Sequence, residues 1–571
     1  MKLKLTLILL FAVNLLFAQN REHAFDVNKR LGRGINYGNM FEDPSSAVNI
    51  ANWKPQYARM ISGLGFSHIR IPIRWETRTT TSEPYTISPS FLAKIKQVVD
   101  SALDNRLHVI INMHHHDSLF ANPEKQKARF LAQWNQISAY FKNYPDSLLF
   151  EILNEPNGNM TAAKWNIFLA DALTEIRKEN PERVVVIGTP DWGGLGGLPY
   201  LQLPDDDNII LTVHYYNPFQ FTHQGASWVS GSTPWLGTKW NDSETEREVV
   251  ANEFAPLVQY GKTHNVPVHI GEFGSYSKAD VTSRKKWTTF LARFLDSTGF
   301  SWAYWEFSAG FGIYNPSTGK YNQYLVDALL HNELPEPARY VGTPLYTSNF
   351  TSTTDGWVLQ KNSSTATLAR ADNALKVTID NGGTEGWHVQ LVKNGMKLTA
   401  GKQYRFSVKV KAETARSATA YIGMNVSPWS AYSGYNGISL ADTFKVYTFL
   451  FTMSATDNNA RIVFDLGNST SDVTITDVKL EDVVLQWPTA VTDIKDLKTT
   501  LYPNPAADRI YINNLDDFDF VTLYNANGKP VFERKLDAML NEIDTESLVS
   551  GLYFVRLNGK NKNQVFKVLK Q

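Results

Sequence analysis

The chain has no cysteine among its 571 residues. This excludes a disulfide framework, a thiolate metal site, a cysteine nucleophile and a lipidated N-terminal cysteine. Its domains must therefore be held together by the burial of apolar surface alone, which is sufficient for domains of ordinary size.

A net charge is also missing, because 56 Lys and Arg residues balance 56 Asp and Glu residues. No overall field favours nucleic acid or an anionic membrane, so we expect no nucleic-acid partner. Beyond the N-terminus, the sequence contains no apolar run long enough to cross a bilayer.

Aromatic residues, in contrast, are abundant. They make up 12% of the chain and include 15 Trp and 25 Tyr. Flat rings suit stacking on the apolar faces of sugar rings, although core packing must account for most of them. A hydrophobic content of 43% and a mean hydropathy of −0.29 are typical of a soluble globular protein. The length predicts about two to four domains.

Residues 1–18 are typical of a signal peptide. Lys2 and Lys4 precede an apolar run over residues 5–17, and Ala18 is a suitable cleavage point. The run is short and is interrupted by Asn14, which makes a membrane anchor the weaker alternative. We therefore predict that the chain is exported.

Strand and helix signals alternate from about residue 34 to 330, and residues 19–340 are the predicted first domain. The alternation favours a (β/α)₈ TIM barrel, an α/β fold, over an open doubly wound sheet, because no glycine-rich dinucleotide motif follows the first strand. Amphipathic helices are predicted at 91–102, 164–177, 248–262 and 284–296. Strands are predicted at 34–37, 68–74, 108–113, 148–153, 183–188, 209–215, 266–270 and 301–307.

The pattern changes near Pro335 and Pro337. Short alternating strands, separated by turn residues, occupy residues 341–487 and predict a β-sandwich. Residues 488–571 are predicted to form a third domain, a small C-terminal β-sandwich.

Two glutamates have neighbours in the sequence that are typical of catalytic carboxylates. Glu155 follows Asn154 and precedes Pro156, and Glu272 lies between Gly271 and Phe273. Each is predicted just past the end of a buried strand. Two carboxylates on one rim are the minimum equipment for breaking a glycosidic bond, since one protonates the leaving oxygen while the other attacks or stabilises the sugar cation. The sequence alone leaves open whether their separation suits retention or inversion.

Further polar and aromatic residues fall at the carboxyl ends of separate predicted strands. In a barrel these ends converge on the face where active sites lie. A nearby cation such as Arg70 would keep the nucleophile ionised. The remaining candidates are Asn36, His114, His115, Asn154, His214, Tyr216 and Trp305.

For some other residues the sequence gives weaker support for a functional role. The run from His114 to Asp117 suggests a metal site, but alternation along a strand would separate the histidines and no zinc motif is present, so we predict neither a metal nor another cofactor. Glu151 and Glu306 are predicted to form structural ion pairs. Outer sugar subsites and loop packing remain equal alternatives for Trp228, Trp235 and Trp240.

The barrel region resembles glycoside hydrolase family 5, most closely its endo-β-1,4-glucanases. The resemblance extends from about residue 31 to 330 and implies a retaining enzyme with Glu155 as acid/base and Glu272 as nucleophile. Its motifs stand in order at 68–75, 111–115, 150–156, 214–216, 221–226, 270–274 and 302–307.

The same resemblance implies roles for the other candidates. Arg70 and Tyr216 would hold the nucleophile, and Asn154 would bind the sugar 2-hydroxyl. His214 would lie near the acid/base, and Trp305 would be the stacking platform under the cleaved sugar. His114 and His115 match the family's histidine pair, and Asn36 its first-strand asparagine. His116 departs from the pattern, which leaves its role open.

The second domain resembles jelly-roll carbohydrate-binding modules, through Asp355-Gly356-Trp357 and the stretches 386–390 and 404–410. Tethering such a module would raise the concentration of the barrel at a polymer surface. A spacer with an aromatic core is the alternative.

The third domain resembles the C-terminal sorting domain of the type IX secretion system of Bacteroidetes. The likeness rests on residues 501–505, 521–528, 548–556 and 567–571. It implies the secretion machinery as a partner, and a secreted or surface-attached location with removal of this domain. An ordinary small β-domain is the alternative.

The sequence therefore predicts a secreted, monomeric endo-β-1,4-glucanase acting on cellulose or mixed-linkage glucan. A β-1,4-mannanase, or an enzyme that accepts both polymers, is the alternative within the same class. A non-catalytic glycan-binding adhesin is the alternative from another class, and the two intact glutamates argue against it.

Overall fold

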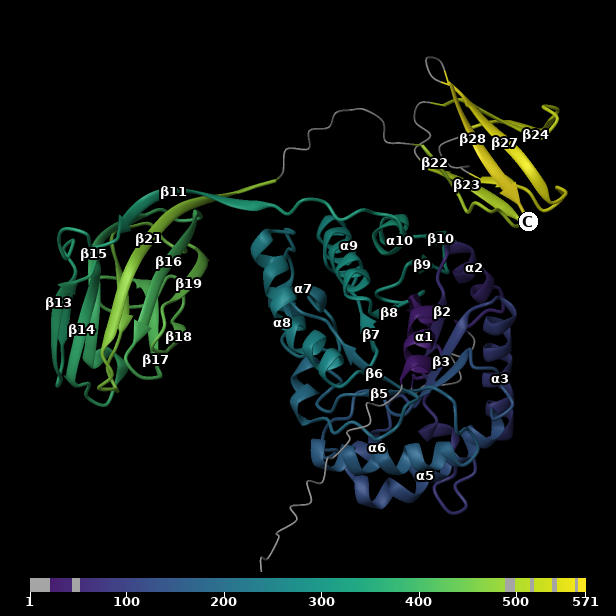
Figure 1. Ribbon diagram of the computed structural model, residues 1–571, viewed down its shortest axis with the longest axis horizontal. Coiled ribbons are helices and arrows are strands. Elements are labelled where there is room, and N and C mark those ends of the chain that lie inside the picture. Colours follow the sequence, from purple (N-terminus) through teal and green to yellow (C-terminus); the bar gives the residue numbers. More distant parts are fainter. Residues whose placement is uncertain (1–20, 44–51, 488–498, 514–517, 537–541, 560–562) are drawn as a thin grey trace, which may run out of the picture. The chain divides into compact units, whose positions relative to one another are not determined.

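The computed structural model describes residues 21–43, 52–487, 499–513, 518–536, 542–559 and 563–571 (Figure 1). The predicted signal peptide, residues 1–18, lies outside the described residues. The chain divides into two compact units, one up to Gln486 and one from Trp487 onward.

Eight parallel strands close into a barrel in sequence order, with β1 paired to both β2 and β8. Helices surround the strands (Figure 1). The predicted TIM barrel is thereby confirmed. The strands are β1 (Arg33–Asn36), β2 (His68–Ile71), β3 (His108–Asn112), β4 (Leu148–Glu151), β5 (Val185–Gly188), β6 (Ile209–His214), β7 (Val268–Phe273) and β8 (Ser301–Tyr304).

The helices form where apolar residues recur at helical spacing and capping residues precede them. Ser243 and Glu246 form a capping box at the start of α8, and Asp280 caps α9. The helices are α1 (Glu22–Leu31), α2 (Gln56–Leu64), α3 (Pro89–Asp104), α4 (Asp117–Ala121), α5 (Pro123–Tyr140), α6 (Ala162–Arg177), α7 (Phe219–Thr222), α8 (Glu244–Thr263), α9 (Val281–Thr298) and α10 (Gln323–Leu330). Short 3₁₀ turns are η2 (Glu76–Arg78), η3 (Leu195–Tyr200) and η4 (Thr233–Trp235).

One end of the barrel is closed by α1, which precedes the first strand. Its Ala24, Val27 and Leu31 are completely buried in a cluster with side chains of four barrel strands or their starts. These partners are Ile110, Leu149, Val184, Val186 and Ile210. The apolar floor leaves the opposite end of the barrel, at the carboxyl ends of the strands, for polar groups.

The seventh strand is longer than predicted. The strand was predicted from the sequence to end at Ile270, whereas β7 continues to Phe273. The register shifts between Val213 and His214 on β6 and again between Ile270 and Phe273 on β7. Such irregularities turn side chains relative to a regular ladder. Glu272 therefore lies within a strand, not beyond its end.

The second predicted β-sandwich domain consists of two antiparallel sheets. One has the order β13-β14-β21-β16-β19 with β11 beside β21, and the other β12-β15-β20-β17-β18. Strict alternation along β16 buries every second residue in the core between the sheets. The strands are β11 (Arg339–Ser348), β12 (Val358–Lys361), β13 (Thr365–Ala371), β14 (Ala374–Asn381), β15 (Val389–Leu398), β16 (Gln403–Ala412), β17 (Arg416–Gly423), β18 (Asn436–Leu440), β19 (Lys445–Thr452), β20 (Asp457–Asp465) and β21 (Val473–Gln486), with a 3₁₀ turn η5 (Gly386–His388) before β15.

The C-terminal unit is also built from strands. A three-stranded sheet, β22-β23-β26, and a four-stranded sheet, β25-β24-β27-β28, share a small core that includes Ile510, Val521 and Val555. The strands are β22 (Thr500–Tyr502), β23 (Arg509–Asn513), β24 (Phe520–Asn525), β25 (Pro530–Lys535), β26 (Glu542–Asp544), β27 (Gly551–Asn558) and β28 (Asn563–Lys570). A small hairpin in the barrel unit, β9 (Tyr314–Asn315) and β10 (Lys320–Tyr321), completes the set.

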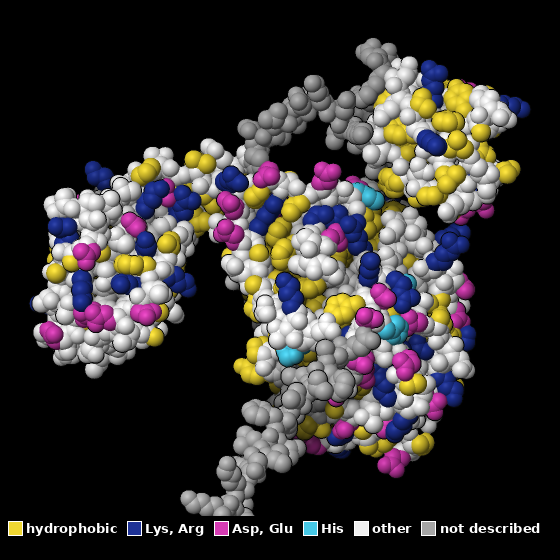
Figure 2. Space-filling model, in the orientation of Figure 1, with side chains coloured by type: hydrophobic (Ala, Val, Ile, Leu, Met, Phe, Trp, Pro, Cys, Tyr) yellow, Lys and Arg dark blue, Asp and Glu magenta, His cyan; other side chains and the backbone are white. Residues whose placement is uncertain are grey.

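The surface shows the balance of charge expected from the composition. Basic and acidic side chains are interspersed on the face drawn in Figure 2. Within the described residues, no helix combines the length and the apolar character that a membrane crossing requires.

Candidate active site

Arg70, near the end of β2, is the centre of a buried hydrogen-bond network. Its guanidinium donates two bonds to the carboxylate of Glu151, at 2.6 and 2.7 Å. It also donates to Glu272 at 2.7 Å, to Asn36 at 2.9 Å and to Asn154 at 2.7 Å. All five N–H donors of Arg70 are thereby engaged. One fixed cation thus orients four side chains, which come from β1, from β4 and the residues just after it, and from β7.

Glu272 is held from two sides. Its Oε1 accepts from Arg70, and its Oε2 accepts from the hydroxyl of Tyr216 at 2.9 Å. Burial raises the pKa of Glu272 above the ordinary carboxyl range; the charges of His214 and Arg70 oppose this shift without cancelling it. Since both oxygens accept hydrogen bonds, the ionised carboxylate is fixed in one orientation.

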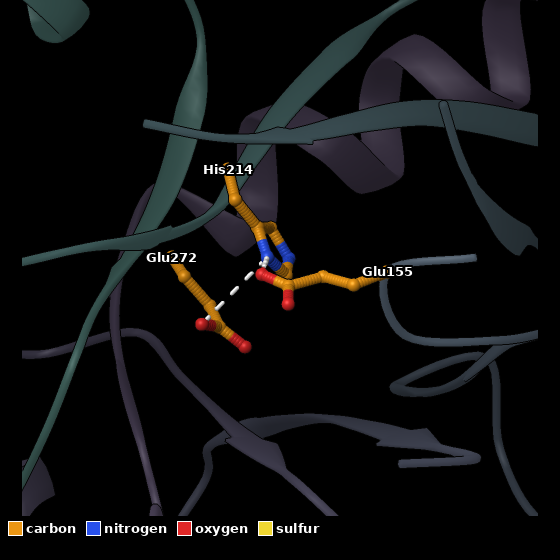
Figure 3. Close-up of side chains that lie close together, drawn as sticks. All are labelled: Glu155, His214 and Glu272. Atoms are coloured by element: carbon orange, nitrogen blue, oxygen red, sulfur yellow. Dashed lines mark hydrogen bonds and ion pairs between the residues drawn. The ribbon is translucent and has the colours of Figure 1, made fainter. Parts of the chain in front are cut away.

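Glu155 and Glu272 approach each other from opposite sides, with His214 between them (Figure 3). The Nδ1 of His214 lies 2.6 Å from Glu155 Oε1 and 3.6 Å from Glu272 Oε2. One carboxylate oxygen of Glu155 and one of Glu272 lie within 4.8 Å of each other. This separation leaves no room for the intervening water of an inverting glycosidase and fits the shorter spacing of a retaining one.

His214 is the basic group shared by the two carboxylates. Burial acts to lower its pKa, but the negative charges of Glu272 and Glu155 outweigh burial, so the pKa of His214 is raised. An imidazolium at this position interacts favourably with both carboxylates. The protonation of the three side chains is therefore coupled.

Glu155 stands on a turn in which the backbone is left-handed, with φ of 45°. Gly193 lies directly against it, since a Cβ atom on Gly193 would stand 3.3 Å from Glu155 Cγ. Gly193 also has φ of 65° and accepts a hydrogen bond from the backbone N–H of His214 at 2.8 Å. The loop after β5 thus supports both the acid/base candidate and its histidine.

The two asparagines near Arg70 are used differently. The amide group of Asn36 donates to backbone carbonyls, including those of Gly271 and Ala303, so its polar atoms are engaged within the protein. Asn154 accepts from Arg70 through its Oδ1. That bond identifies Oδ1 as the acceptor side of the Asn154 amide and fixes the orientation of the group.

The histidine run after β3 divides between faces. His114 is buried, stacks on the Trp305 indole with ring centroids 5.9 Å apart and planes 7° from parallel, and contacts Asn112 through its Nδ1 at 3.0 Å. Burial lowers the pKa of His114 well below its usual value, so it is neutral. His115 lies edge-on to His114, with centroids 4.4 Å apart.

His116 belongs to a different environment. It is fully buried, with its Nε2 3.0 Å from the side-chain oxygen of Gln133 on α5. Its Nδ1 lies 3.6 Å from Glu76. His116 therefore supports the loop after β3, and the three consecutive histidines do not form one ligand set.

Among the described residues, only Glu155, His214 and Glu272 form a cluster whose ligand atoms are close enough to hold a metal ion. Both oxygens of Glu272 already accept hydrogen bonds, one from a guanidinium. A metal ion at Glu272 would have to compete with the charge of Arg70. The donor set therefore suits proton transfer better than metal coordination.

The two other strand glutamates differ from each other. Glu151 forms the predicted ion pair, with Arg70. The prediction was wrong for Glu306, which is buried and accepts backbone N–H groups of Ser308, Ala309 and Phe311 at 2.7–3.0 Å. Its carboxylate organises the loop after β8 through main-chain donors, which the residue pattern of a strand cannot reveal.

The three tryptophans after β6 have different environments. Trp240 is 2% exposed and stacks on Phe290, so its side chain packs inside the protein and is not available to a sugar. Trp228 is 58% exposed and lies edge-on to Tyr276. Trp235 is half-buried beside Phe219. Trp228 thus remains available as an outer sugar contact.

Trp192, in the loop after β5, was not among the residues predicted from the sequence. Its side chain is 62% exposed, and its backbone N–H donates to the carbonyl of Pro156 at 3.1 Å, next to Glu155. The available signal was the sequence Pro190-Asp191-Trp192-Gly193-Gly194 directly after a strand, in which turn residues flank a large aromatic side chain.

A TIM barrel with two close carboxylates at its catalytic rim defines the class of retaining glycosidases. A family model described as "Cellulase (glycosyl hydrolase family 5)" matches residues 37–310. The chain belongs to this family. Models of a carbohydrate binding domain and of a secretion system C-terminal sorting domain match residues 344–472 and 500–571.

Among solved structures, the chain is similar to the endoglucanase Cel5A of Thermotoga maritima, at 46% identity, covering 54% of this chain and 99% of that chain with a TM-score of 0.53. The same Cel5A has been solved with cellobiose and with mannotriose, each with 45% identity, 54% and 100% coverage and a TM-score of 0.53.

Among curated proteins, the chain is 34% identical to endoglucanase H of Acetivibrio thermocellus over 314 residues, which are 54% of this chain and 33% of that protein. It is 28% identical to the cellulase/esterase CelE of the same organism, covering 51% of this chain and 37% of that protein. The chain thus spans only about a third of the length of these two relatives.

Proposed function

We propose that the protein is a secreted retaining endo-β-1,4-glucanase that hydrolyses internal linkages of cellulose or mixed-linkage β-glucan. The observation that carries the proposal is the pair of carboxylate oxygens of Glu155 and Glu272 within 4.8 Å. That spacing matches direct attack by one carboxylate while the other supplies a proton. The similarity to endoglucanases supports the choice of polymer.

In the first step, a carboxylate oxygen of Glu272 attacks the anomeric carbon and the bond to the leaving sugar oxygen breaks. Glu155 gives its proton to that oxygen, so the departing chain leaves as a neutral alcohol. In the second step, Glu155 takes a proton from water, and the hydroxide attacks the anomeric carbon and releases Glu272. Arg70 and Tyr216 hold the nucleophile in place for both steps.

The other site residues complete this assignment. Asn154 donates to the sugar 2-hydroxyl, His214 stabilises the charge shared by the two carboxylates, and Trp305 stacks beneath the cleaved sugar. His114 and His115 line the same rim, and Asn36 acts through Arg70. Because every one of these residues comes from one chain, we propose a monomer that needs no cofactor.

A dual glucanase and mannanase activity is the second candidate. The similar Cel5A has been solved with both cellobiose and mannotriose. The substrates differ in the orientation of the 2-hydroxyl, which Asn154 would contact. A β-mannanase without glucanase activity has no specific support.

The remaining domains would deliver the enzyme to its substrate. We propose that residues 341–487 bind the polysaccharide, that residues 488–571 direct type IX secretion, and that a signal peptide at 1–18 precedes the catalytic domain at 19–340. The product would be an extracellular or surface-attached enzyme.

The test is reducing-sugar release by the full chain on carboxymethylcellulose, barley β-glucan and glucomannan, beside Glu272→Gln. Activity on the two glucans that disappears in the variant supports the glucanase, and additional activity on glucomannan supports dual specificity. Proton NMR of the first product gives the stereochemistry, and retention is expected. If the wild type binds insoluble cellulose but does not hydrolyse any of the three polymers, the result supports the non-catalytic glycan-binding adhesin instead.

A further inference from the structure

Glu306, just after β8, is a buried carboxylate that the proposed mechanism does not use. Its side chain is fully buried, and among the described residues its hydrogen-bond partners are three main-chain N–H groups. One oxygen accepts from Ser308 at 3.0 Å and from Ala309 at 2.7 Å, and the other accepts from Phe311 at 3.0 Å. Burial raises the pKa of Glu306 to about 7. Because a buried carboxylate is costly, its presence indicates a role for the loop that it closes.

The segment around Glu306 is packed against glycines from both sides. A Cβ atom on Gly38, after β1, would lie 2.9 Å from Trp305 Cζ2 and 3.0 Å from Glu306 Cβ. A Cβ atom on Gly274, after β7, would lie 2.2 Å from the Trp305 carbonyl oxygen and 3.1 Å from Phe311 Cδ1. Since β1 and β7 are the two neighbours of β8 in the barrel, the main chain at Trp305 is confined from both sides.

The loop that Glu306 closes also contacts the support of the nucleophile. The Phe311 ring is buried and lies edge-on to Tyr216, with centroids 6.3 Å apart. Tyr216 in turn donates to Glu272. The carbonyl of Phe311 accepts from the hydroxyl of Tyr304, in β8, at 3.0 Å. The loop is therefore fixed to the end of β8 and connects it to the residue that holds the nucleophile.

We propose that Glu306 is a positioning residue for Trp305, the platform under the cleaved sugar. The inference rests on the proposed function. An aromatic ring supports a sugar only when the planes of the two rings are aligned. His114 stacks on the Trp305 indole, with planes 7° from parallel, and so holds the ring itself. Glu306 fixes the main chain from which the ring projects, so that the platform is in place before the substrate arrives.

The test is a double-mutant cycle on the full chain. Glu306→Gln keeps the size of the side chain, but its NH₂ group cannot accept a hydrogen bond, so at least one main-chain donor loses its acceptor. We expect kcat/KM for cellopentaose to fall about tenfold, because a displaced platform is misaligned with the sugar. In a Trp305→Ala background, which has no platform to position, the same change should cost less than about twofold. Tyr200→Ala, at a side chain that is 65% exposed, should leave both values unchanged.

Glu42→Gln is the matched control, because Glu42 has the same kind of environment in another loop. It is buried, and its carboxylate accepts the main-chain N–H groups of residues 39–41 after β1. Any loss of kcat/KM in this variant should be the same in the wild-type and Trp305→Ala backgrounds, since Glu42 does not act through the platform.

An equal loss from Glu306→Gln in both backgrounds would overturn the proposal, since Glu306 would then act independently of Trp305. No loss in the wild-type background would also overturn it. Fluorine NMR of the full chain labelled with 5-fluorotryptophan does not depend on hydrolysis. The Trp305 resonance, identified by its absence from Trp305→Phe, should shift or broaden in Glu306→Gln and not in Glu42→Gln; an unchanged resonance contradicts the proposal. Absence of hydrolysis by the wild type, in contrast, contradicts only the proposed function.

If Glu306→Gln does not fold, Ala309→Pro provides the same test. It removes one of the three N–H donors to Glu306 and lies at an exposed position. The same coupling to Trp305→Ala and the same change of the Trp305 resonance are expected. Their absence would contradict the proposal.

Discussion

The two ends of the barrel interior differ in the kind of side chain that they bury. At the end closed by α1, apolar residues such as Ile110 and Leu149 pack against the helix, and even His68 is neutral because burial lowers its pKa to about 3. At the catalytic end, Arg70, Glu151 and Glu272 are buried together with their charges. Buried apolar contacts stabilise a fold, whereas buried ion pairs contribute little net stability. The comparison indicates that one end maintains the barrel and the other serves chemistry.

The largest effect is expected from Glu272→Gln at the catalytic end. Loss of the nucleophile should lower kcat by on the order of 10⁴-fold or more. Gln retains the size of the side chain and an acceptor for Arg70, so the unfolding midpoint should stay close to that of the wild type. Initial rates on barley β-glucan and thermal unfolding of the same samples check both expectations. A large drop in the unfolding temperature would show that this end also maintains the fold.

Leu149→Ala, at the floor, should have the opposite profile. Its side chain is completely buried, so removal should cost about 2–5 kcal/mol of unfolding free energy. The kcat/KM of the folded enzyme should stay within about twofold, because the floor does not contact the substrate. Urea unfolding measures the loss of unfolding free energy. Kinetics at temperatures below the thermal unfolding transition measure kcat/KM. Ile167→Ala on α6, where the side chain is 56% exposed, is the control and should be nearly neutral. Normal stability of Leu149→Ala would contradict the conclusion that this end of the barrel maintains the fold.

The dependence of kcat/KM on pH distinguishes the effects of the individual charged groups at the catalytic end. The raised pKa of Glu272 means that kcat/KM should fall with decreasing pH above the range of an ordinary carboxyl group, since protonated Glu272 cannot attack. His214 lowers the pKa of Glu272, so His214→Asn should move this acid limb to higher pH. Glu151 balances the charge of Arg70, so Glu151→Gln should move the limb to lower pH. Shifts on the order of one pH unit are expected.

These opposite shifts are measured as kcat/KM against pH with an aryl β-cellobioside, which reports the free enzyme. Tyr200→Ala should leave the acid limb unchanged. Movement of both variants in the same direction would mean that distortion of the site, not charge, determines the profile.

The smallest effect is expected outside both ends, at the start of α8. Ser243→Ala removes the capping side chain that accepts from the Glu246 backbone and should cost about 1 kcal/mol. Activity should not change. Urea unfolding beside Glu248→Ala, an exposed position on the same helix, measures the difference. Equal stabilities would show that the capping box contributes nothing here.

Much of the barrel could be predicted from sequence because its signals are local. Each of the eight predicted strands overlaps an observed one, and four helices were predicted from apolar spacing. The position of Arg70, Glu155 and Glu272 at one rim followed from parallel strands alone. The family motifs extended this to His214 and Tyr216, which the structure brings into contact with the two carboxylates.

Other features depend on contacts between distant segments. The end of β7 was misplaced because its last residues are defined by pairing with β6 and β8, which continues the strand through Glu272 and is not visible in the residue pattern. Glu306 was assigned an ion pair because its main-chain donors are not visible in a residue pattern. Trp192 was missed because exposure and backbone strain are properties of the folded chain.

The sequence by itself determined the barrel, the β-rich character of the rest of the chain and the placement of Glu155 and Glu272 at the same rim, because periodicity and residue type act locally along the chain. Only the tertiary structure decided how close Glu155 and Glu272 lie, how the donors of Arg70 are divided, and which tryptophans face solvent. Those quantities depend on the registers of eight strands and the loops between them, and interaction energies between charges change steeply over a few ångströms.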